Sequence, residues 1–222
     1  MPVKVLFLDY DGVIVDSMGP KAEAIADAFA PYSDDRAAIA EGFHRHAGSG
    51  REAQFDRIYR DLTGKALDAP TRARIVAAFL ERIDAINDTV GLFPGVHAFV
   101  VAQAARRLVA VVTGVPGDEA ARQLARFGLA SCLAAVHGAT REAPKHVHMT
   151  RFLEARGLAP ADALFAGDSQ TDMQQASLAG IPFVGIGTPD FFAAGAPLAV
   201  VPRLPDLAPL IDESRPVSPS VP

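Results

Sequence analysis

The sequence of 222 residues has one cysteine, Cys132, and no tryptophan. A single cysteine excludes an internal disulfide framework and any Cys-x-x-Cys metal or redox site. We therefore expect the protein to work in a reducing compartment. Cys132 lies in an apolar run, and we expect its side chain to fill space in the buried core.

The sequence also lacks runs of basic residues and long uninterrupted apolar stretches. Its 26 acidic and 21 basic residues give a net charge of −5, which argues against nonspecific nucleic-acid binding. The most apolar long stretch, residues 176–201, is interrupted by three prolines and Asp190, so it does not predict a membrane-spanning helix. Residues 1–8 run directly into Asp9 and do not resemble a signal peptide. We expect a cytoplasmic protein without a membrane or nucleic-acid partner.

Half of the residues are hydrophobic, and the length suits one core domain with a smaller inserted one. Short, almost continuous apolar runs resemble strands buried on both faces of a parallel sheet. These runs cover residues 3–8, 108–112, 132–136, 163–166 and 182–186. Helical patterns lie between them, at residues 96–107, 118–127, 144–156 and 172–179. This alternation predicts a doubly wound α/β fold, whose active site lies at the carboxyl ends of the strands.

The segment between the first two strands has a different pattern, with helical stretches and no strand. The expected helices cover residues 18–29, 34–46, 51–62 and 70–86. We therefore predict an α/β core formed by residues 1–16 and 93–213, with an inserted all-α domain at residues 17–92. The Pro- and Ser-rich residues 214–222 are predicted to be a disordered tail.

Carboxylates follow two of the predicted strands. Asp9 and Asp11 come directly after the first strand, and Asp168 and Asp172 follow the strand at residues 163–166. Taken singly, Asp11-Gly12 fits a simple turn and Asp172 a helix cap. Together, the four carboxylates would meet at one edge of the sheet, where each like-charged pair at roughly 4 Å costs about 4 kcal/mol. The cluster needs a cation, and an all-oxygen ligand set favours Mg²⁺.

Two further segments suit an anion. Thr113 and Gly114 end another strand with a hydroxyl and a flexible backbone donor, and Lys145 begins a helix. Fixed donors and an ammonium group lower the barrier of phosphoryl transfer when they contact the peripheral oxygens. Taken singly, Thr113 also fits a hydroxyl that caps a turn, and Lys145 a solvated side chain.

In this order the motifs resemble those of the haloacid dehalogenase-like (HAD) hydrolase superfamily. The resemblance is to the branch of phosphoglycolate phosphatases and β-phosphoglucomutases that carries a helical cap, and it spans residues 3 to about 201. The matching segments are residues 9–17 (DYDGVIVDS), residues 112–114 (VTG), Lys145 and residues 167–172 (GDSQTD). The resemblance implies a Rossmann-like core with the inserted helices as its cap.

The resemblance also implies roles for these residues. Asp9 would attack phosphorus to form an aspartyl phosphate, and Asp11 would act as general acid and then as general base. Mg²⁺ would be held by the Asp9 side chain, the Asp11 backbone carbonyl and Asp168, with Asp172 in support. The phosphoryl group would be bound by Gly12, Thr113, Gly114 and Lys145. Arg51, in a segment similar to a substrate-contacting cap loop, would bind the rest of the substrate.

A carboxylate at position 11 favours phosphate esters over the halide and phosphonate substrates of other members of the superfamily. The predicted function is a Mg²⁺-dependent phosphatase acting on a small phosphorylated metabolite. One alternative is a sugar-phosphate mutase, which is disfavoured because residues 18–20 supply no polar group like the cap-side histidine of the mutases. Another is a catalytically silent phosphate-binding protein, which the complete set of expected groups argues against.

Overall fold

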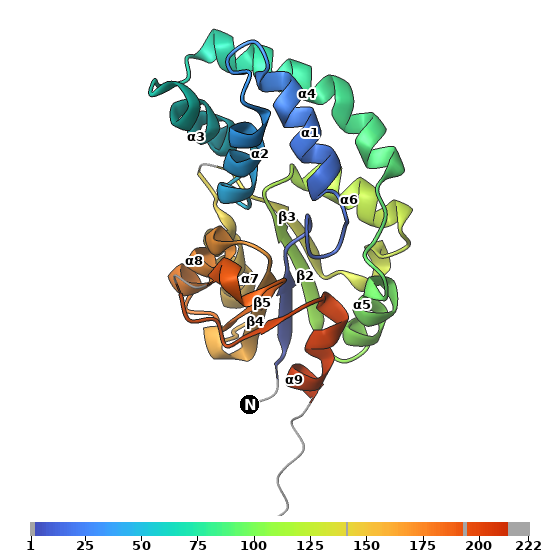
Figure 1. Ribbon diagram of the computed structural model, residues 1–222. Coiled ribbons are helices and arrows are strands. Elements are labelled where there is room, and N and C mark those ends of the chain that lie inside the picture. Colours follow the sequence, from blue (N-terminus) through green and yellow to red (C-terminus); the bar gives the residue numbers. More distant parts are fainter. Residues whose placement is uncertain (1–2, 141, 193–194, 213–222) are drawn as a thin grey trace, which may run out of the picture.

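The structure is a computed structural model that describes residues 3–140, 142–192 and 195–212. Its centre is a six-stranded parallel sheet with the order β3-β2-β1-β4-β5-β6 (Figure 1). The strands are β1 (Val5–Leu8), β2 (Leu108–Thr113), β3 (Ala135–Gly138), β4 (Ala163–Gly167), β5 (Phe183–Ile186) and β6 (Ala199–Val201). The predicted doubly wound α/β class is confirmed.

Burial along the strands explains why they appear in the sequence as continuous apolar runs. All four residues of β1 are fully buried, because side chains of alternate residues enter two different apolar layers. Leu6 and Leu8 belong to one layer, and Val5 and Phe7 belong to the other. The edge strand β3 is only half-buried along its length.

Helices cover both faces of the sheet (Figure 1). One face packs against α5 (Val96–Ala104), α6 (Gly117–Arg126) and α9 (Ala208–Asp212). The other face packs against α7 (Lys145–Glu154) and α8 (Gln170–Ala179).

The helical insertion lies over the carboxyl ends of the strands (Figure 1). It consists of α1 (Met18–Phe29), α2 (Arg36–Arg45), α3 (Arg51–Thr63) and α4 (Ala69–Thr89), and we call it the cap. It has its own apolar core. In that core the Phe55 ring packs edge-to-face against Phe29 and Phe79, with ring centroids 5.9 and 5.4 Å apart. Each predicted helix is present, with ends within three residues of the expected ones.

The two connections between core and cap run side by side. The Asp16 N–H donates to the Gly91 carbonyl at 3.0 Å, and the Phe93 N–H donates to the Ile14 carbonyl at 3.1 Å. The domain boundaries after residues 16 and 92 stay a prediction. The tail expected at residues 214–222 lies outside the described residues.

Two sequence predictions need correction. The strand expected at residues 132–136 begins only at Ala135, and Cys132 ends a short 3₁₀ turn (Ala130–Cys132) where its side chain is half-buried. An apolar turn packed against the core has the same hydrophobicity as a strand, so the pattern did not separate them. The sequence also did not predict β6, an edge strand of three residues. Among the described helices, none combines the length and the apolarity needed to cross a bilayer.

Candidate active site

Three of the four predicted carboxylates form one cluster at the carboxyl edge of the sheet, and the fourth, Asp11, pairs with Lys21 of the cap. Strands β1 and β4 are neighbours, and the Asp9 N–H donates to the Ala166 carbonyl at 2.9 Å, which keeps the two chains together as they leave the sheet. Oxygens of Asp9, Asp168 and Asp172 all lie within 4.8 Å of one another. The tertiary structure therefore brings residues 9 and 168 into a single acidic cluster.

Gly12 closes the loop after β1 tightly over this cluster. Its φ is +76°, a left-handed conformation that favours glycine. A Cβ at this position would collide with the Asp168 carboxylate. The absence of a side chain at Gly12 is what lets the segments at residues 9–17 and 167–172 approach each other.

Lys145 is fully buried between two of the carboxylates. Its Nζ lies 2.7 Å from Asp9 Oδ1 and 2.6 Å from Asp172 Oδ1. Burial lowers the pKa of Lys145, but the charges of Asp172 and Asp9 outweigh that effect and raise the pKa overall. The lysine is therefore a charged member of the cluster. The alternative that Lys145 is a solvent-exposed side chain is excluded.

Asp172 is held from several sides at the start of α8. Its Oδ1 accepts from Lys145, and its Oδ2 accepts from the Ser169 hydroxyl at 2.6 Å. The Ser169 oxygen in turn accepts from the Asp172 N–H at 3.1 Å, so the two residues form a capping box. The N-cap of α8 is therefore Ser169 and not Asp172, which is the third helical residue and accepts from the Ser169 N–H at 3.3 Å. Asp172 is part of the acidic cluster, and its engaged oxygens suit a supporting place beside a metal ion.

Thr113 and Gly114 form the next loop along the edge. The Thr113 oxygen accepts from the Val115 N–H at 3.1 Å, so the hydroxyl does cap the turn and keeps its proton for donation. A Cβ at Gly114 would lie 3.1 Å from the Gly50 nitrogen of the cap. The cap loop around Gly48 also contacts the cluster, because a Cβ there would lie 3.1 Å from Asp172 Oδ1. Cap and core thus close over the same site.

Charge in the site is unbalanced. Burial first, and then the charge of Asp172, raise the pKa of Asp9 to about 8 against the lowering effect of Lys145. Burial and the charges of Asp9 and Asp172 likewise raise the pKa of Asp168 well above its usual value. Lys145 contacts Asp9 and Asp172, and Lys21 contacts Asp11, so the two ammonium groups would offset only two of the four carboxylates if all four were ionised. An all-oxygen cluster with this excess charge fits a divalent cation such as Mg²⁺.

The comparisons with known proteins agree with this geometry. Residues 3–180 match the model of the haloacid dehalogenase-like hydrolases. The chain belongs to this family. Phosphoglycolate phosphatase from Mesorhizobium japonicum is 28% identical over 187 residues, covering 82% of each chain. Phosphoglycolate phosphatase from Rhodospirillum rubrum is 32% identical over 195 residues, covering 83% of this chain and 79% of that one.

Solved structures of HAD-like proteins share the whole fold. A Streptococcus pneumoniae protein of this family superposes with a TM-score of 0.76 at 21% identity, covering 94% of this chain and 98% of its own. A predicted phosphoglycolate phosphatase from Haemophilus somnus gives a TM-score of 0.78 at 22% identity, covering 93% of this chain and 97% of that one. These similarities show that core and cap together form a HAD fold.

Lys21 is a site residue of this HAD hydrolase that the sequence analysis missed. Its side chain is 5% exposed, and its Nζ lies 2.6 Å from Asp11 Oδ1, which also accepts from the Ser17 hydroxyl. Ser17 and Lys21 are four residues apart at the start of α1 and so share a helix face, a spacing that could have revealed the pair. Residues 18–20 supply no polar group, as the sequence analysis stated, but the next residue, Lys21, places a polar cap-side group beside Asp11.

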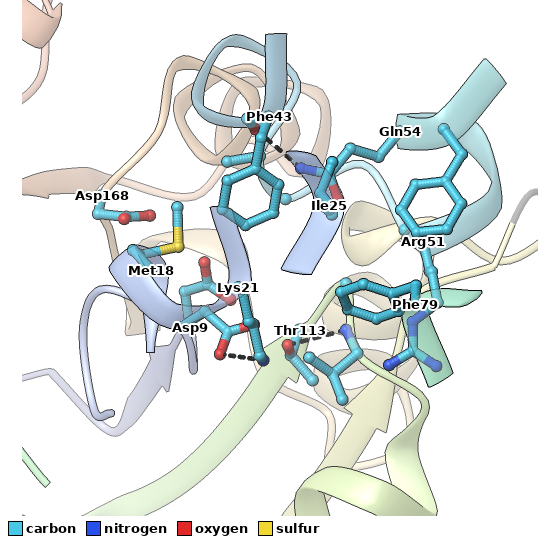
Figure 2. Close-up of a pocket in the computed structure, with 17 residues that line it drawn as sticks. Asp9, Met18, Lys21, Ile25, Phe43, Arg51, Gln54, Phe79, Thr113 and Asp168 are labelled. Carbon is cyan, nitrogen blue, oxygen red and sulfur yellow. Dashed lines mark hydrogen bonds and ion pairs between the residues drawn. The ribbon is translucent and has the colours of Figure 1, made fainter. Parts of the chain in front are cut away.

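Arg51 lies at the far side of the site from Asp168 (Figure 2). Its guanidinium donates to Glu119 of the core at 2.8 Å and stacks over the Phe79 ring at 5.2 Å. It lines the same pocket as Asp9, Thr113 and Asp168. That pocket is lined by residues of both the cap and the core. Its cap wall is mainly apolar and includes Met18, Ile25, Phe43, Phe55 and Phe79.

Proposed function

We propose that this protein is a Mg²⁺-dependent phosphatase that hydrolyses a small phosphorylated metabolite through an aspartyl phosphate on Asp9. The observation that carries the proposal is the cluster of carboxylates from two neighbouring strands, with buried ammonium groups, beside a pocket between cap and core. Because the relatives described above are phosphoglycolate phosphatases, phosphoglycolate is the first substrate to test.

The metal would be held by the Asp9 and Asp168 carboxylates and the Asp11 backbone carbonyl, with Asp172 in support. When bound, Mg²⁺ withdraws charge from a phosphoryl oxygen and offsets the excess negative charge of the cluster. It would also favour the ionised form of Asp9, which is the form that attacks phosphorus.

Asp9 and Asp11 would carry the two displacements. In the first, an Asp9 oxygen bonds to phosphorus, the ester P–O bond breaks, and Asp11 gives its proton to the leaving oxygen. In the second, Asp11 takes a proton from a water molecule, whose oxygen attacks phosphorus and releases Asp9. Lys21 and Ser17, which both donate to Asp11 Oδ1, would hold this carboxyl group in place through both steps.

The phosphoryl oxygens would be bound by donors that are already fixed. The Thr113 hydroxyl is held by the turn it caps, and Lys145 is held by two carboxylates. Thr113 and Gly114 line the pocket, and Lys145 contacts Asp9, which also lines it. The Gly12 N–H is already donated to the Val15 carbonyl. Donors held in advance stabilise the developing charge without having to reorganise during the reaction. The apolar cap wall would limit the entry of water during the first step.

The test is phosphate release from a panel of phosphorylated metabolites, with Mg²⁺ and with EDTA. We expect turnover with Mg²⁺, loss of turnover with EDTA, and no turnover by Asp9→Asn protein whose circular dichroism is unchanged. Asp118→Asn is the matched control, because that side chain is 75% exposed on the surface of α6 and should leave activity intact. Wild-type protein that is inactive on every ester with Mg²⁺ would contradict the proposal.

A sugar-phosphate mutase is the second candidate, favoured by the single observation that Lys21 of the cap contacts Asp11. The two activities differ in product. Incubation with a hexose 1-phosphate should release inorganic phosphate if the protein is a phosphatase, and yield the isomeric sugar phosphate if it is a mutase.

A further inference from the structure

One core carboxylate binds two side chains of the cap. Glu119 lies in the first turn of α6, and its Oε2 accepts from Arg51 Nη2 at 2.8 Å. Its Oε1 accepts from Asn87 Nδ2 at 3.1 Å. Arg51 begins α3 and Asn87 lies near the end of α4, so Glu119 joins two different cap helices to the core. We call this group of three residues the Glu119 anchor.

The anchor is shielded from solvent. The side chains of Arg51 and Glu119 are 16% and 13% exposed, and Asn87 is buried. An ion pair in such a place is screened much less by water and salt than a surface pair. The Phe79 ring, 5.2 Å from the guanidinium, adds a further contact that fixes its plane. Arg51 is therefore held in one position before any ligand arrives.

That position is useful to a substrate. Arg51 lines the pocket on the side opposite to Asp168 (Figure 2). Arg51 donates to Glu119 through Nη2. No other described residue accepts a hydrogen bond from its guanidinium, so the donors of Nε and Nη1 are available to a ligand. A phosphate ester bound at the acidic cluster would extend across the apolar wall toward this guanidinium.

We propose that Glu119 is a positioning residue that holds Arg51 in place to bind a second anionic group of the substrate. This inference rests on the proposed function and narrows it to phosphate monoesters that carry a carboxylate or another anion a few atoms from the phosphate. A guanidinium fixed in advance loses little conformational entropy on binding. The charge of Glu119 does not cancel the attraction, because the ligand would contact Arg51 directly while Glu119 lies beyond the guanidinium.

The test compares two esters that differ only in the second anion, phosphoglycolate and ethyl phosphate. In Glu119→Gln protein we expect KM for phosphoglycolate to rise about tenfold, with kcat and the KM for ethyl phosphate changing less than about twofold. Glu119→Asp, which keeps the charge, should recover part of the loss. In an Arg51→Ala background, Glu119→Gln should have no further effect, because Glu119 acts through Arg51. Asp118→Asn, one residue away on the same helix, is the matched control for charge removal.

Two results would overturn the inference. An equal rise in KM for both esters would mean that Glu119 only supports cap closure, and a lower KM for phosphoglycolate would mean that its charge opposes the anion. Dissociation constants for the same two esters can be measured calorimetrically in Asp9→Asn protein with Mg²⁺. They report the contribution of the Glu119 anchor to substrate binding in the absence of turnover. Inactive wild type therefore contradicts the proposed function, whereas unselective loss of binding in Glu119→Gln contradicts the anchor.

Discussion

Lys21 shows how a single side chain can join the cap to the chemistry of the core. It belongs to the first cap helix, yet its ammonium group contacts Asp11, which belongs to the loop after β1. A charge-assisted hydrogen bond at 2.6 Å in a nearly buried place both orients the carboxyl group and offsets its charge. Movement of α1 relative to the core would change this contact directly.

Replacement of Lys21 tests its importance. We expect Lys21→Met to lower kcat by about 10- to 100-fold, since loss of a hydrogen bond to a charged group costs about 1.5–3 kcal/mol. Lys21→Arg keeps the charge and should retain more activity. Steady-state kinetics on the best ester measures both. Lys65→Met, at an exposed lysine of the cap, is the control and should match wild type. Equal activity of Lys21→Met and wild type would contradict a role for Lys21 in the reaction.

Gly12 is the second residue whose role can be isolated, because Gly64 offers a matched control. Both have positive φ, +76° and +70°, but nothing lies within 4 Å of a Cβ at Gly64, whereas at Gly12 it would meet Asp168. Each change to alanine should cost about 1–2 kcal/mol of unfolding free energy for the left-handed backbone. Only Gly12→Ala should also abolish the rise in Tm caused by Mg²⁺. A normal Mg²⁺ response in Gly12→Ala would show that Asp168 tolerates the extra carbon.

At the scale of elements, the start of α8 links fold stability to the site. Ser169 caps this helix and also donates to Asp172, which pairs with Lys145. The sequence predicted a helix start at this place from the acidic residue alone. The structure shows that the serine completes the cap, so one short turn both ends β4 and supports the acidic cluster.

Ser169→Ala should lower the unfolding free energy by about 1 kcal/mol, the usual loss for an N-cap residue. Activity should fall as well, because Asp172 loses one of its donors. Ser177→Ala is the control, since Ser177 lies exposed on the same helix and alanine is the better helix former there. Urea denaturation of the two variants gives the comparison, and equal stabilities would contradict the capping role.

At the scale of the whole molecule, metal binding and stability should be linked through pH. Without metal, the folded state holds a proton on Asp9 up to a pKa of about 8, whereas the unfolded state releases it near 3.8. Between these values the folded state binds more protons, so its stability falls as pH rises. Mg²⁺ replaces that proton and should stabilise more at high pH.

We therefore expect Tm in EDTA to decrease between pH 7 and pH 9, and the increase caused by Mg²⁺ to be larger at pH 9 than at pH 7. This window avoids His44, His137 and His148, whose pKa values are lowered by burial and which act on stability below about pH 6.5. Thermal denaturation across the series measures both effects. Asp9→Asn should make the profile less steep but not flat, because the pKa of Asp168 is raised as well. An unchanged slope in that variant would assign the dependence to another group.

The core was largely predictable from local patterns. A strand that is buried on both faces needs a continuous apolar run, and the carboxyl ends of parallel strands share one edge of the sheet, so Asp9 and Asp168 could be brought together from sequence order alone. The sequence did not predict the short edge strand β6 or the apolar turn at Cys132, because each has too few residues to show a distinctive period of hydrophobicity.

What the sequence by itself determined is thus which side chains stand at the strand ends and which segments are helical, because these depend on residues close together in the chain. Only the tertiary structure decided that Lys21 contacts Asp11 and that Arg51 is bound by Glu119. Those contacts depend on how the cap sits on the core, and the partners of the Arg51 pair are 68 residues apart. No local period encodes that placement, since it is set by the packing of two surfaces.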